Sequence, residues 1–362
     1  MIKNNFSKII YTREKTREVK IGNLKIGGSA PISVQSMTNT DTKKVEDTVK
    51  QIKNMEEAGC ELVRVAVPNL EVCSVLPLIR KQINIPLVAD VHFNYQIVLK
   101  CIELGIDGVR INPGNIKDKE QLKSIIKKAK EKEIPIRFGI NSGSLDPIIT
   151  KKYTRITAYS LLESANKVIK ILEEMNYHNI IFSLKSSSVM DTINANILFA
   201  QQYSYPLHIG ITEAGPYFSG VIKSSVGIGI LLYLGLGNTI RVSITDDPVK
   251  EVKVGYEILK SLNLRKRGPQ IISCPTCARC QVNLKKIVED IEERTKNLKK
   301  SITIAVMGCV VNGPGEAREA DIGIAYHKNI AVIFKNGEVV GKFSEKEIID
   351  ILFLEIEKMS SK

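Results

Sequence analysis

Residues 62–111 read LVRVAVPNLEVCSVLPLIRKQINIPLVADVHFNYQIVLKCIELGIDGVRI, and this stretch decides the fold. Three short apolar runs, at 62–67, 87–91 and 108–111, alternate with segments whose apolar residues recur at helical spacing. Short runs that are hydrophobic almost throughout are typical of parallel strands covered on both faces. The stretch therefore predicts successive strand–helix units of a parallel sheet.

The same alternation continues on both sides of this stretch. Further runs lie at 32–35, 134–140, 180–184, 207–211 and 240–244, and each interval has room for a helix. Eight such units predict a (β/α)8 barrel of the TIM type over residues 1–265, with a doubly wound sheet as the alternative. We expect residues 1–30 to form a hairpin or a plug at the base of the barrel.

Polar residues gather at the carboxyl ends of the predicted strands, where barrel enzymes bind their substrates. They are Gln35, Ser36, Thr38, Arg64, Asp90, His92, Arg110, Asn112, Arg137, Asn141, Lys185, Thr212, Glu213, Arg241, Ser243 and Asp246. Burying an unpaired guanidinium is costly, yet four arginines and one lysine occur here, with only Asp90 and Glu213 as acids on these strands. This excess predicts a polyanionic ligand, most simply a diphosphate held by bidentate contacts.

Two glycines, Gly227 and Gly229, are expected at the start of the helix after the seventh strand. Barrels often bind phosphate in this region, so both glycines are candidates for phosphate contacts. A Gly-x-Gly pair is a weak signal by itself, and we favour close helix packing as its explanation.

Three cysteines and a glutamate near the C-terminus have the spacing of metal ligands. Cys274 and Cys277 form a C-x2-C pair, and Cys309 and Glu316 follow in the glycine-rich segment MGCVVNGPGE. Thiolates two residues apart can bind one centre, and a distant ligand completes the site on folding. Three thiolates and one carboxylate leave one ligand different from the others, which suits an iron–sulfur cluster with one exchangeable iron.

Zinc is the alternative metal for this set, although a zinc ribbon needs a second C-x2-C pair and only Cys309 follows. Cys274, Cys277 and Cys280 also resemble the start of a ferredoxin motif, but the fourth cysteine of that motif is missing. We therefore expect Cys280 not to be a ligand.

Beyond a polar linker at 265–270, residues 271–362 predict a small α+β domain that carries all these ligands. We expect helices at 282–298 and 346–359 and strands at 303–306, 322–325, 331–334 and 339–343. A redox domain joined to a phosphate-binding barrel implies reductive chemistry on a phosphorylated metabolite.

Composition limits the remaining classes of protein. The chain has 362 residues, 43% hydrophobic and 25% charged, which is typical of a soluble globular protein. The N-terminus has no apolar segment typical of a signal peptide, the apolar stretch 226–237 is too short to span a bilayer, and seven cysteines suggest no disulfide framework. We therefore expect a cytoplasmic protein that does not bind membranes.

The formal net charge is +13, which first suggests nucleic acid as a partner. Many of the lysines lie beside glutamates in helical patterns, and no tryptophan or basic patch interleaved with aromatic residues is present. An enzyme acting on an anionic small molecule fits better.

Several motifs resemble the 4-hydroxy-3-methylbut-2-enyl diphosphate synthase family in its two-domain bacterial form. They are QSMTNTDT, RINPGN, GITEAG, CPTC and VMGCVVNGPGEA, and the resemblance runs in order from about Thr12 to Phe343. It implies reductive ring opening and dehydration of 2-C-methyl-D-erythritol 2,4-cyclodiphosphate in the non-mevalonate route to isoprenoids. It also implies electrons from flavodoxin or ferredoxin, and a homodimer whose active site is shared between subunits.

The resemblance also assigns roles to individual residues. Cys274, Cys277, Cys309 and Glu316 would bind a [4Fe-4S] cluster, and the catalytic residues would be Glu213 and Glu316. The substrate would be bound by Arg64, Arg110, Arg137, Asn141, Lys185, Thr212, Arg241 and Ser243. The alternative is a barrel lyase or aldolase that acts on a phosphorylated metabolite and carries a structural zinc module.

Overall fold

The computed structural model describes residues 11–116, 118–296, 298–309, 313–327, 330–345 and 347–360. The chain divides into two compact units, Met1–Arg265 and Lys266–Lys362. Each unit has its own large hydrophobic core.

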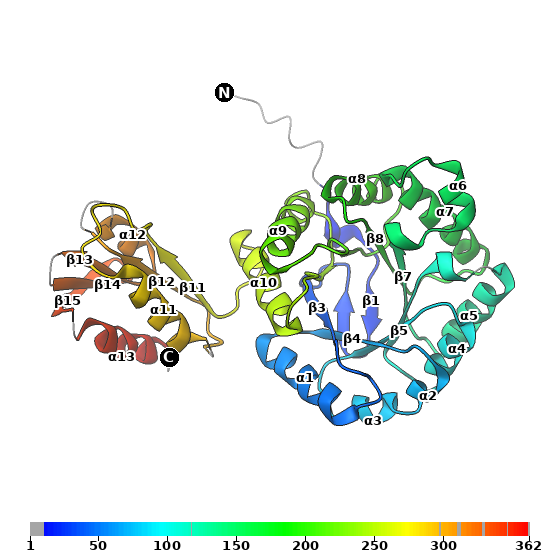
Figure 1. The fold of residues 1–362 in the computed structure, drawn as a ribbon, viewed down its shortest axis with the longest axis horizontal. Coiled ribbons are helices and arrows are strands. Elements are labelled where there is room, and N and C mark those ends of the chain that lie inside the picture. Colours follow the sequence, from blue (N-terminus) through cyan, green and yellow to red (C-terminus); the bar gives the residue numbers. More distant parts are fainter. Residues whose placement is uncertain are drawn as a thin grey trace. The chain divides into compact units, whose positions relative to one another are not determined.

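The first unit is a barrel of eight parallel strands, which confirms the predicted fold class (Figure 1). Its strands are β3 (Ser33–Met37), β4 (Leu62–Ala66), β5 (Leu87–Val91), β6 (Gly108–Ile111), β7 (Ile136–Asn141), β8 (Ile180–Lys185), β9 (His208–Ile209) and β10 (Thr239–Ile240). They are ordered β8-β7-β6-β5-β4-β3-β10-β9, and a single parallel bridge from Phe182 to Leu207 joins the two ends of this sheet.

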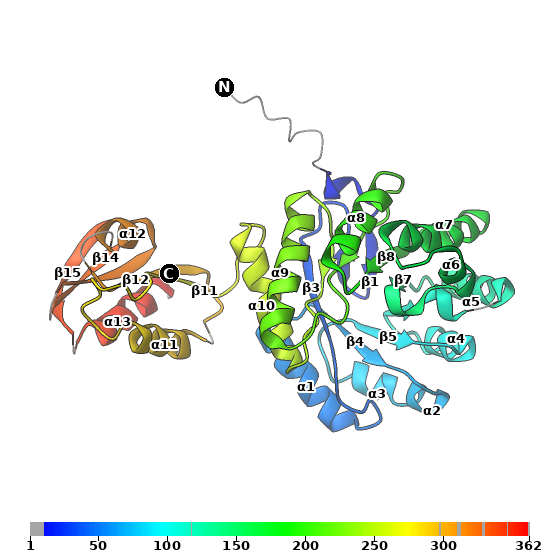
Figure 2. The ribbon, with the colours of Figure 1, turned by 45° about the horizontal axis from the view of Figure 1, so that its top comes forward.

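Helices surround the strands, as Figure 2 shows. They are α1 (Val45–Ala58), α2 (Leu70–Cys73), α3 (Leu76–Arg80), α4 (Tyr95–Glu103), α5 (Lys119–Glu131), α6 (Pro147–Lys152), α7 (Ala158–Glu174), α8 (Val189–Ala200), α9 (Tyr217–Tyr233) and α10 (Pro248–Ser261). Short 3-10 turns lie at η2 (Arg13–Lys15), η3 (Pro113–Asn115) and η4 (Ser142–Ser144). No helix among the described residues is long and apolar enough to cross a membrane.

All eight predicted strands occur, but the seventh and eighth are shorter than predicted. The apolar runs 207–211 and 240–244 contain only the two-residue strands β9 and β10. Thr212 and Thr245 still contact neighbouring segments, through a hydrogen bond to Ser186 and a bridge to Pro216. Ile211 and Val242 are still buried beyond the regular pairing, which explains why the apolar runs extend past β9 and β10.

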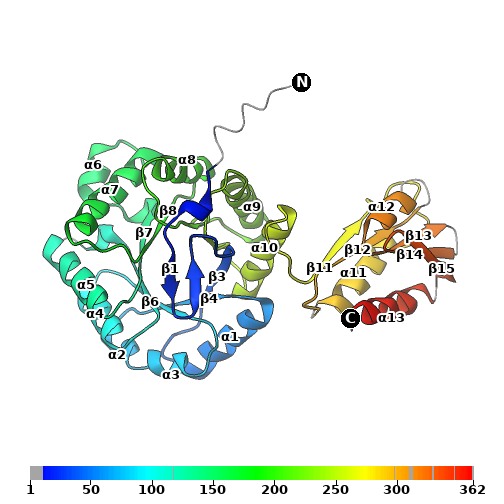
Figure 3. The same ribbon diagram turned by 180° about the vertical axis from the view of Figure 1, so that it is seen from behind.

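An antiparallel hairpin closes the amino-terminal end of the barrel (Figure 3). It consists of β1 (Val19–Ile21) and β2 (Leu24–Ile26). Ile21 and Ile26 pack against Leu62, Val88 and Ile181 from the barrel strands. Residues 11–30 thus contain the hairpin and plug that we expected, and residues 1–10 lie outside the described residues.

The second unit is a five-stranded mixed sheet with helices on both faces. It contains β11 (Pro269–Ser273), α11 (Leu284–Thr295), β12 (Ile302–Met307), α12 (Gly313–Glu319), β13 (Ile322–His327), β14 (Ile330–Lys335), β15 (Glu338–Ser344) and α13 (Ile348–Ser360). The strands follow in sequence order, and only the β11–β12 and β12–β13 pairs are parallel. Helices α11 and α13 pack on one face, and α12 packs on the other.

Strand β11 and helix α12 were not predicted from the sequence. The predicted linker at 265–270 is wrong at its end, because Pro269 and Gln270 already pair with Ile302 and Thr303 of β12. Proline is tolerated as the first residue of an edge strand, so its presence does not exclude the strand.

Candidate active site

The barrel brings the five predicted cationic residues into one region of its interior. Arg64, Arg110 and Arg137 lie on β4, β6 and β7, Lys185 ends β8, and Arg241 directly follows β10. Burial lowers the pKa of Arg64 to about 9 against the attraction of Asp90. Burial, followed by the charges of the other cations, holds the pKa of Lys185 well below its usual value.

Asp90, the last but one residue of β5, neutralises part of this charge. Its carboxylate lies 3.2 Å from Nε of Arg64 and 3.0 Å from Nη1 of Arg110, and 3.5 Å from His92 Nε2. Burial alone would raise the pKa of Asp90, but Arg64, His92 and Arg110 hold it well below its usual range. Asp90 is therefore ionised and serves two arginines at once.

A second carboxylate, Glu251 on α10, neutralises Arg241. Both oxygens accept from this guanidinium, at 3.0 Å from Nε and 3.1 Å from Nη2, and Glu251 is 3% exposed. It also accepts from Ser36 Oγ at 2.8 Å and from the Ile244 N–H at 3.2 Å. Glu251 was not predicted from the sequence, because the acids expected to pair with the arginines were those on the strands and this one lies on the following helix.

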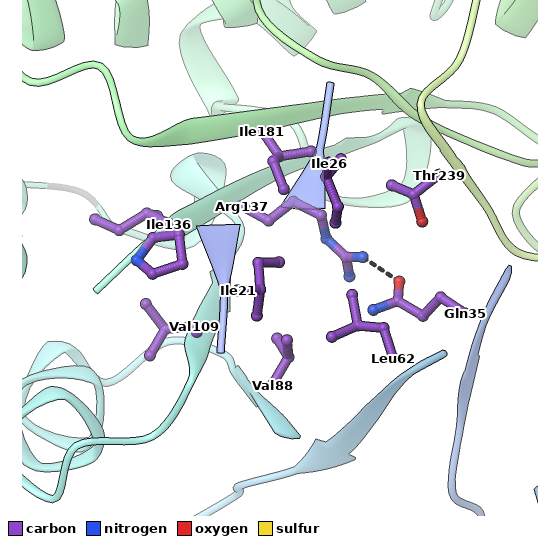
Figure 4. Close-up of a pocket in the computed structure, with 12 residues that line it drawn as sticks. Ile21, Ile26, Gln35, Leu62, Val88, Val109, Ile136, Arg137, Ile181 and Thr239 are labelled. Atoms are coloured by element: carbon purple, nitrogen blue, oxygen red, sulfur yellow. Dashed lines mark hydrogen bonds between the residues drawn. The ribbon is translucent and has the colours of Figure 1, made fainter. Parts of the chain in front are cut away.

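Arg137 and Lys185 have no carboxylate partner among the described residues. Arg137 donates from Nη1 to the amide oxygen of Gln35, and its Nε and Nη2 are buried without a hydrogen-bond partner (Figure 4). Burial and the neighbouring charges of Arg64 and Arg110 hold the pKa of Arg137 well below its usual value. The site therefore has five cationic groups and only two carboxylates, and it retains an excess of positive charge that an anion can neutralise.

Two glycines make room for these long side chains. A Cβ at Gly139 would lie 2.5 Å from Nε of Arg110, and a Cβ at Gly210 would lie 2.8 Å from Nζ of Lys185. Any larger residue would displace the cationic groups or the strands that carry them.

Asn141, Thr212 and Ser243 are half-buried at the same carboxyl ends of the strands. Asn141 is the register partner of Lys185. Glu213 follows Thr212, is exposed, and has a left-handed backbone with φ of 51°. The Oε1 atom of Glu213 lies close to the loop after β7. A Cβ built on Gly143 in that loop would be 3.9 Å from this oxygen. A non-glycine residue held in this conformation marks a strained position of the kind that clusters at functional sites.

His208 on β9 is a buried polar residue that the sequence analysis did not single out. It is 1% exposed, and neither ring nitrogen has a hydrogen-bond partner among the described residues. Burial and the charge of Lys185 hold the pKa of His208 well below its usual value, so the imidazole is neutral. Only its place within an apolar run could have identified it.

Gly227 and Gly229 do not begin a helix, so that expectation is wrong. Both lie inside α9, which starts at Tyr217. A Cβ at Gly227 would lie 2.5 Å from Cδ1 of Ile211, so Gly227 is required for close packing of the helix on the barrel.

In the second unit, the predicted ligands follow two neighbouring parallel strands. Cys274 directly follows β11, and Cys309 lies two residues after β12. The Gly308 N–H donates to Sγ of Cys274 at 3.3 Å. Cys277 is exposed, and Glu316 is exposed in the first turn of α12. No group of three or more His, Cys, Asp or Glu side chains in the described parts of the chain is close enough to hold a metal ion.

Cys280 packs beside the turn that leads to Cys309. Its thiol donates to the Val282 carbonyl at 3.3 Å, and a Cβ at Gly308 would lie 2.4 Å from its sulfur. The glycine before Cys309 therefore allows Cys280 to pack against the turn.

Both units match models of one protein family. Residues 16–256 match the GcpE TIM-barrel domain, and residues 270–358 match the GcpE protein C-terminal domain. The chain belongs to the GcpE family. This result confirms the resemblance drawn from the motifs, and the two GcpE domains coincide with the barrel and the mixed sheet.

Similar GcpE proteins are named 4-hydroxy-3-methylbut-2-en-1-yl diphosphate synthase (flavodoxin). The protein of Caldanaerobacter subterraneus subsp. tengcongensis is 53% identical over 351 residues, which cover 97% of this chain and 99% of the relative. The protein of Geobacter sulfurreducens is 51% identical over 347 residues, which cover 96% and 98% of the two chains.

Among solved structures, dihydropteroate synthases share the fold of the GcpE barrel. The Yersinia pestis enzyme in complex with a sulfonamide drug has a TM-score of 0.51 at 11% identity, covering 69% of this chain and 100% of that chain. The Stenotrophomonas maltophilia enzyme has a TM-score of 0.50 at 12% identity, covering 68% and 97%. These identities establish a common fold alone.

Proposed function

We propose that this chain catalyses the reductive ring opening and dehydration of 2-C-methyl-D-erythritol 2,4-cyclodiphosphate to 4-hydroxy-3-methylbut-2-enyl diphosphate. Its GcpE relatives align with nearly the whole length of the chain and are named as synthases of this product. The observation that carries the proposal within the molecule is the excess of buried cationic groups over carboxylates in the barrel. Such a region binds a diphosphate in preference to a neutral or cationic metabolite.

The diphosphate would be held by Arg64, Arg110, Arg137, Lys185 and Arg241. Arg137 has free N–H groups in a buried setting, so each hydrogen bond that it gives to phosphate replaces an unsatisfied donor. Asn141 and Ser243 would add neutral hydrogen bonds at the carboxyl ends of β7 and β10. These contacts would fix the orientation of the cyclic substrate before any bond is broken.

The thiols of Cys274, Cys277 and Cys309, with the Glu316 carboxylate, would hold a [4Fe-4S] cluster. The donor set fits this group, because the segments that carry it follow adjacent parallel strands and the Gly308 N–H already donates to the Cys274 sulfur. Backbone donors to sulfur are among the interactions that tune such clusters. When bound, the cluster would supply single-electron transfer and a Lewis-acidic iron.

Glu213 would provide or orient the proton for the dehydration step, with Thr212 beside it. The carboxylate stands at the carboxyl end of the barrel and follows a segment hydrogen-bonded to the end of β8. The left-handed backbone at Glu213 fixes the direction in which its side chain leaves the loop. A positioned carboxyl group of this kind contributes to proton transfer in the transition state.

We further propose a cytoplasmic homodimer that receives electrons from flavodoxin or ferredoxin, with the barrel of one subunit facing the cluster domain of its partner. Helix α9 offers an apolar surface for a second copy. Its exposed large apolar side chains are Tyr217 at 46%, Phe218 at 77%, Ile222 at 47%, Val226 at 47%, Ile230 at 39% and Tyr233 at 67%. Large apolar groups at a helical repeat on a surface mark interaction sites.

The decisive experiment uses protein purified without oxygen. Reduced flavodoxin and the cyclodiphosphate are added, and product formation is followed by mass spectrometry together with the iron and sulfide content of the protein. We expect turnover that requires the reductant, and a reduced-cluster paramagnetic resonance signal that changes when substrate is added. Protein that contains zinc without iron, and acts independently of a reductant, would replace this proposal with the lyase alternative.

A further inference from the structure

Gln35 and Arg137 form a buried contact at the centre of the barrel. Gln35 is 1% exposed and Arg137 is 4% exposed, and the Gln35 amide oxygen accepts from Nη1 of Arg137 (Figure 4). It is the only hydrogen bond that the described residues give to this guanidinium, whose other two nitrogens are buried without partners. The orientation of Arg137 therefore depends on one neutral side chain.

The other three arginines of the site are held by carboxylates. Asp90 contacts Arg64 and Arg110, and Glu251 contacts Arg241 through both of its oxygens. A carboxylate orients a guanidinium and also cancels its charge, whereas an amide orients it and leaves the charge uncancelled. Among the four arginines of the site, Arg137 is thus the one held by an amide.

Below Arg137, the cavity lining holds no charged partner for this side chain, and its other polar members are Gln35 and Thr239, whose Oγ1 has no hydrogen-bond partner among the described residues. A cavity of about 10 Å³, room for roughly one water molecule, separates it from the floor. The floor side chains are apolar, among them Ile21, Ile26 and Val88. Without Gln35, the guanidinium would face an apolar floor on one side and repelling cations on the other.

We propose that Gln35 is a positioning residue that holds Arg137 toward the diphosphate while leaving its charge available to the ligand. This inference rests on the proposed function, because it assumes that the barrel binds a diphosphate. Gln35 would act through Arg137, to which it is hydrogen-bonded. Its neutrality is the property that matters, so the isosteric carboxylate is the most informative replacement.

The test compares Gln35→Glu and Gln35→Met with the wild-type protein. Binding of inorganic pyrophosphate to the full chain is measured by titration calorimetry, and thermal unfolding is measured on the same samples. In Gln35→Glu, the new carboxylate is expected to pair with Arg137, which raises the melting temperature and weakens pyrophosphate binding about tenfold or more, equal to about 1.4 kcal/mol. If Gln35 had only a structural role, Gln35→Glu would lower the melting temperature and would not combine a higher melting temperature with weaker pyrophosphate binding.

Gln35→Met removes the acceptor without adding charge and keeps the test open if the glutamate variant does not fold. We expect weaker pyrophosphate binding and no gain in melting temperature. Gln82→Glu is the matched control, because Gln82 is exposed and its change adds the same charge away from the cations. This control should bind pyrophosphate as the wild type does.

The inference and the proposed function fail in different ways. Wild-type affinity in Gln35→Glu and Gln35→Met, in protein that turns over the cyclodiphosphate, would overturn the role of Gln35 alone. Wild-type protein that binds pyrophosphate but never converts the cyclodiphosphate would overturn the proposed function, and the affinities of the two variants would still decide the role of Gln35. In active protein, both variants should raise KM more than they lower kcat, because the change acts on diphosphate binding.

Discussion

Replacing Glu251 with glutamine is expected to destabilise the barrel more than any change to a surface ion pair. Glu251 is buried and accepts four hydrogen bonds, two of them from Arg241. The amide would place an N–H₂ group against donors and would leave the guanidinium without its negative partner. Removing one member of a buried ion pair costs about 3–5 kcal/mol. At roughly 2–4 °C per kcal/mol for a unit of this size, the melting temperature should fall by about 6–20 °C.

The measurement is thermal and urea unfolding of the full chain without ligand. Glu174→Gln is the control, since its carboxylate forms an exposed pair with Lys119 at 3.0 Å. Exposed pairs of this kind contribute about 1 kcal/mol or less, so the control should melt within a few degrees of the wild type. Equal melting temperatures for both variants would refute the view that Glu251 neutralises a buried Arg241. Added pyrophosphate should stabilise Glu251→Gln, because the anion can take over part of the lost interaction with Arg241.

Three further predictions concern charge, ligands and catalysis. The pKa of Lys185 is lowered in the folded protein, so the unfolded chain binds more protons at this position. The resulting loss of folding stability is complete below the folded pKa and disappears as the pH rises toward 10.5. Lys185→Met should therefore stabilise the ligand-free protein by about 1–3 kcal/mol at neutral pH and flatten the rise of stability with alkaline pH, as measured by urea unfolding across pH. Cys309→Ser should lose iron, sulfide and activity together, whereas Cys280→Ser should keep all three in elemental analysis and assay, and a cluster lost with Cys280 would reverse the ligand assignment. Glu213→Gln should lower turnover about 10²–10⁴-fold while pyrophosphate binding stays within about twofold, and undiminished turnover would remove Glu213 from the reaction.

Much of the barrel could be predicted because each strand is buried on both faces. Runs such as 87–91 are buried at every position and apolar except for Asp90, and the interval between two runs has the length of a helix. The β11 strand was not predicted because it is not buried on both faces. It lies at the edge of its sheet, begins with Pro269 and is only partly buried, so its sequence resembles a linker. Edge strands carry a weaker pattern because fewer of their side chains face a core.

The residues of the site were also only partly predictable from the sequence. Cationic residues inside apolar runs were visible in the sequence, because a charge in such a run is unusual. Their partners were not visible. Glu251 lies on a helix with other charged residues and reaches Ser36, which is more than two hundred positions away in the chain. Only the closed ring of strands brings these two residues together.

The hairpin of β1 and β2 determines how molecules exchange at the barrel. Because this hairpin packs its apolar side chains against the barrel strands, a ligand of the cationic residues would enter from the carboxyl ends of the strands. A bound molecule would leave by the same end of the barrel at which the next one arrives. If the chain has the proposed activity, product and substrate would compete for this end of the barrel. A designed inhibitor can be lengthened only in the outward direction.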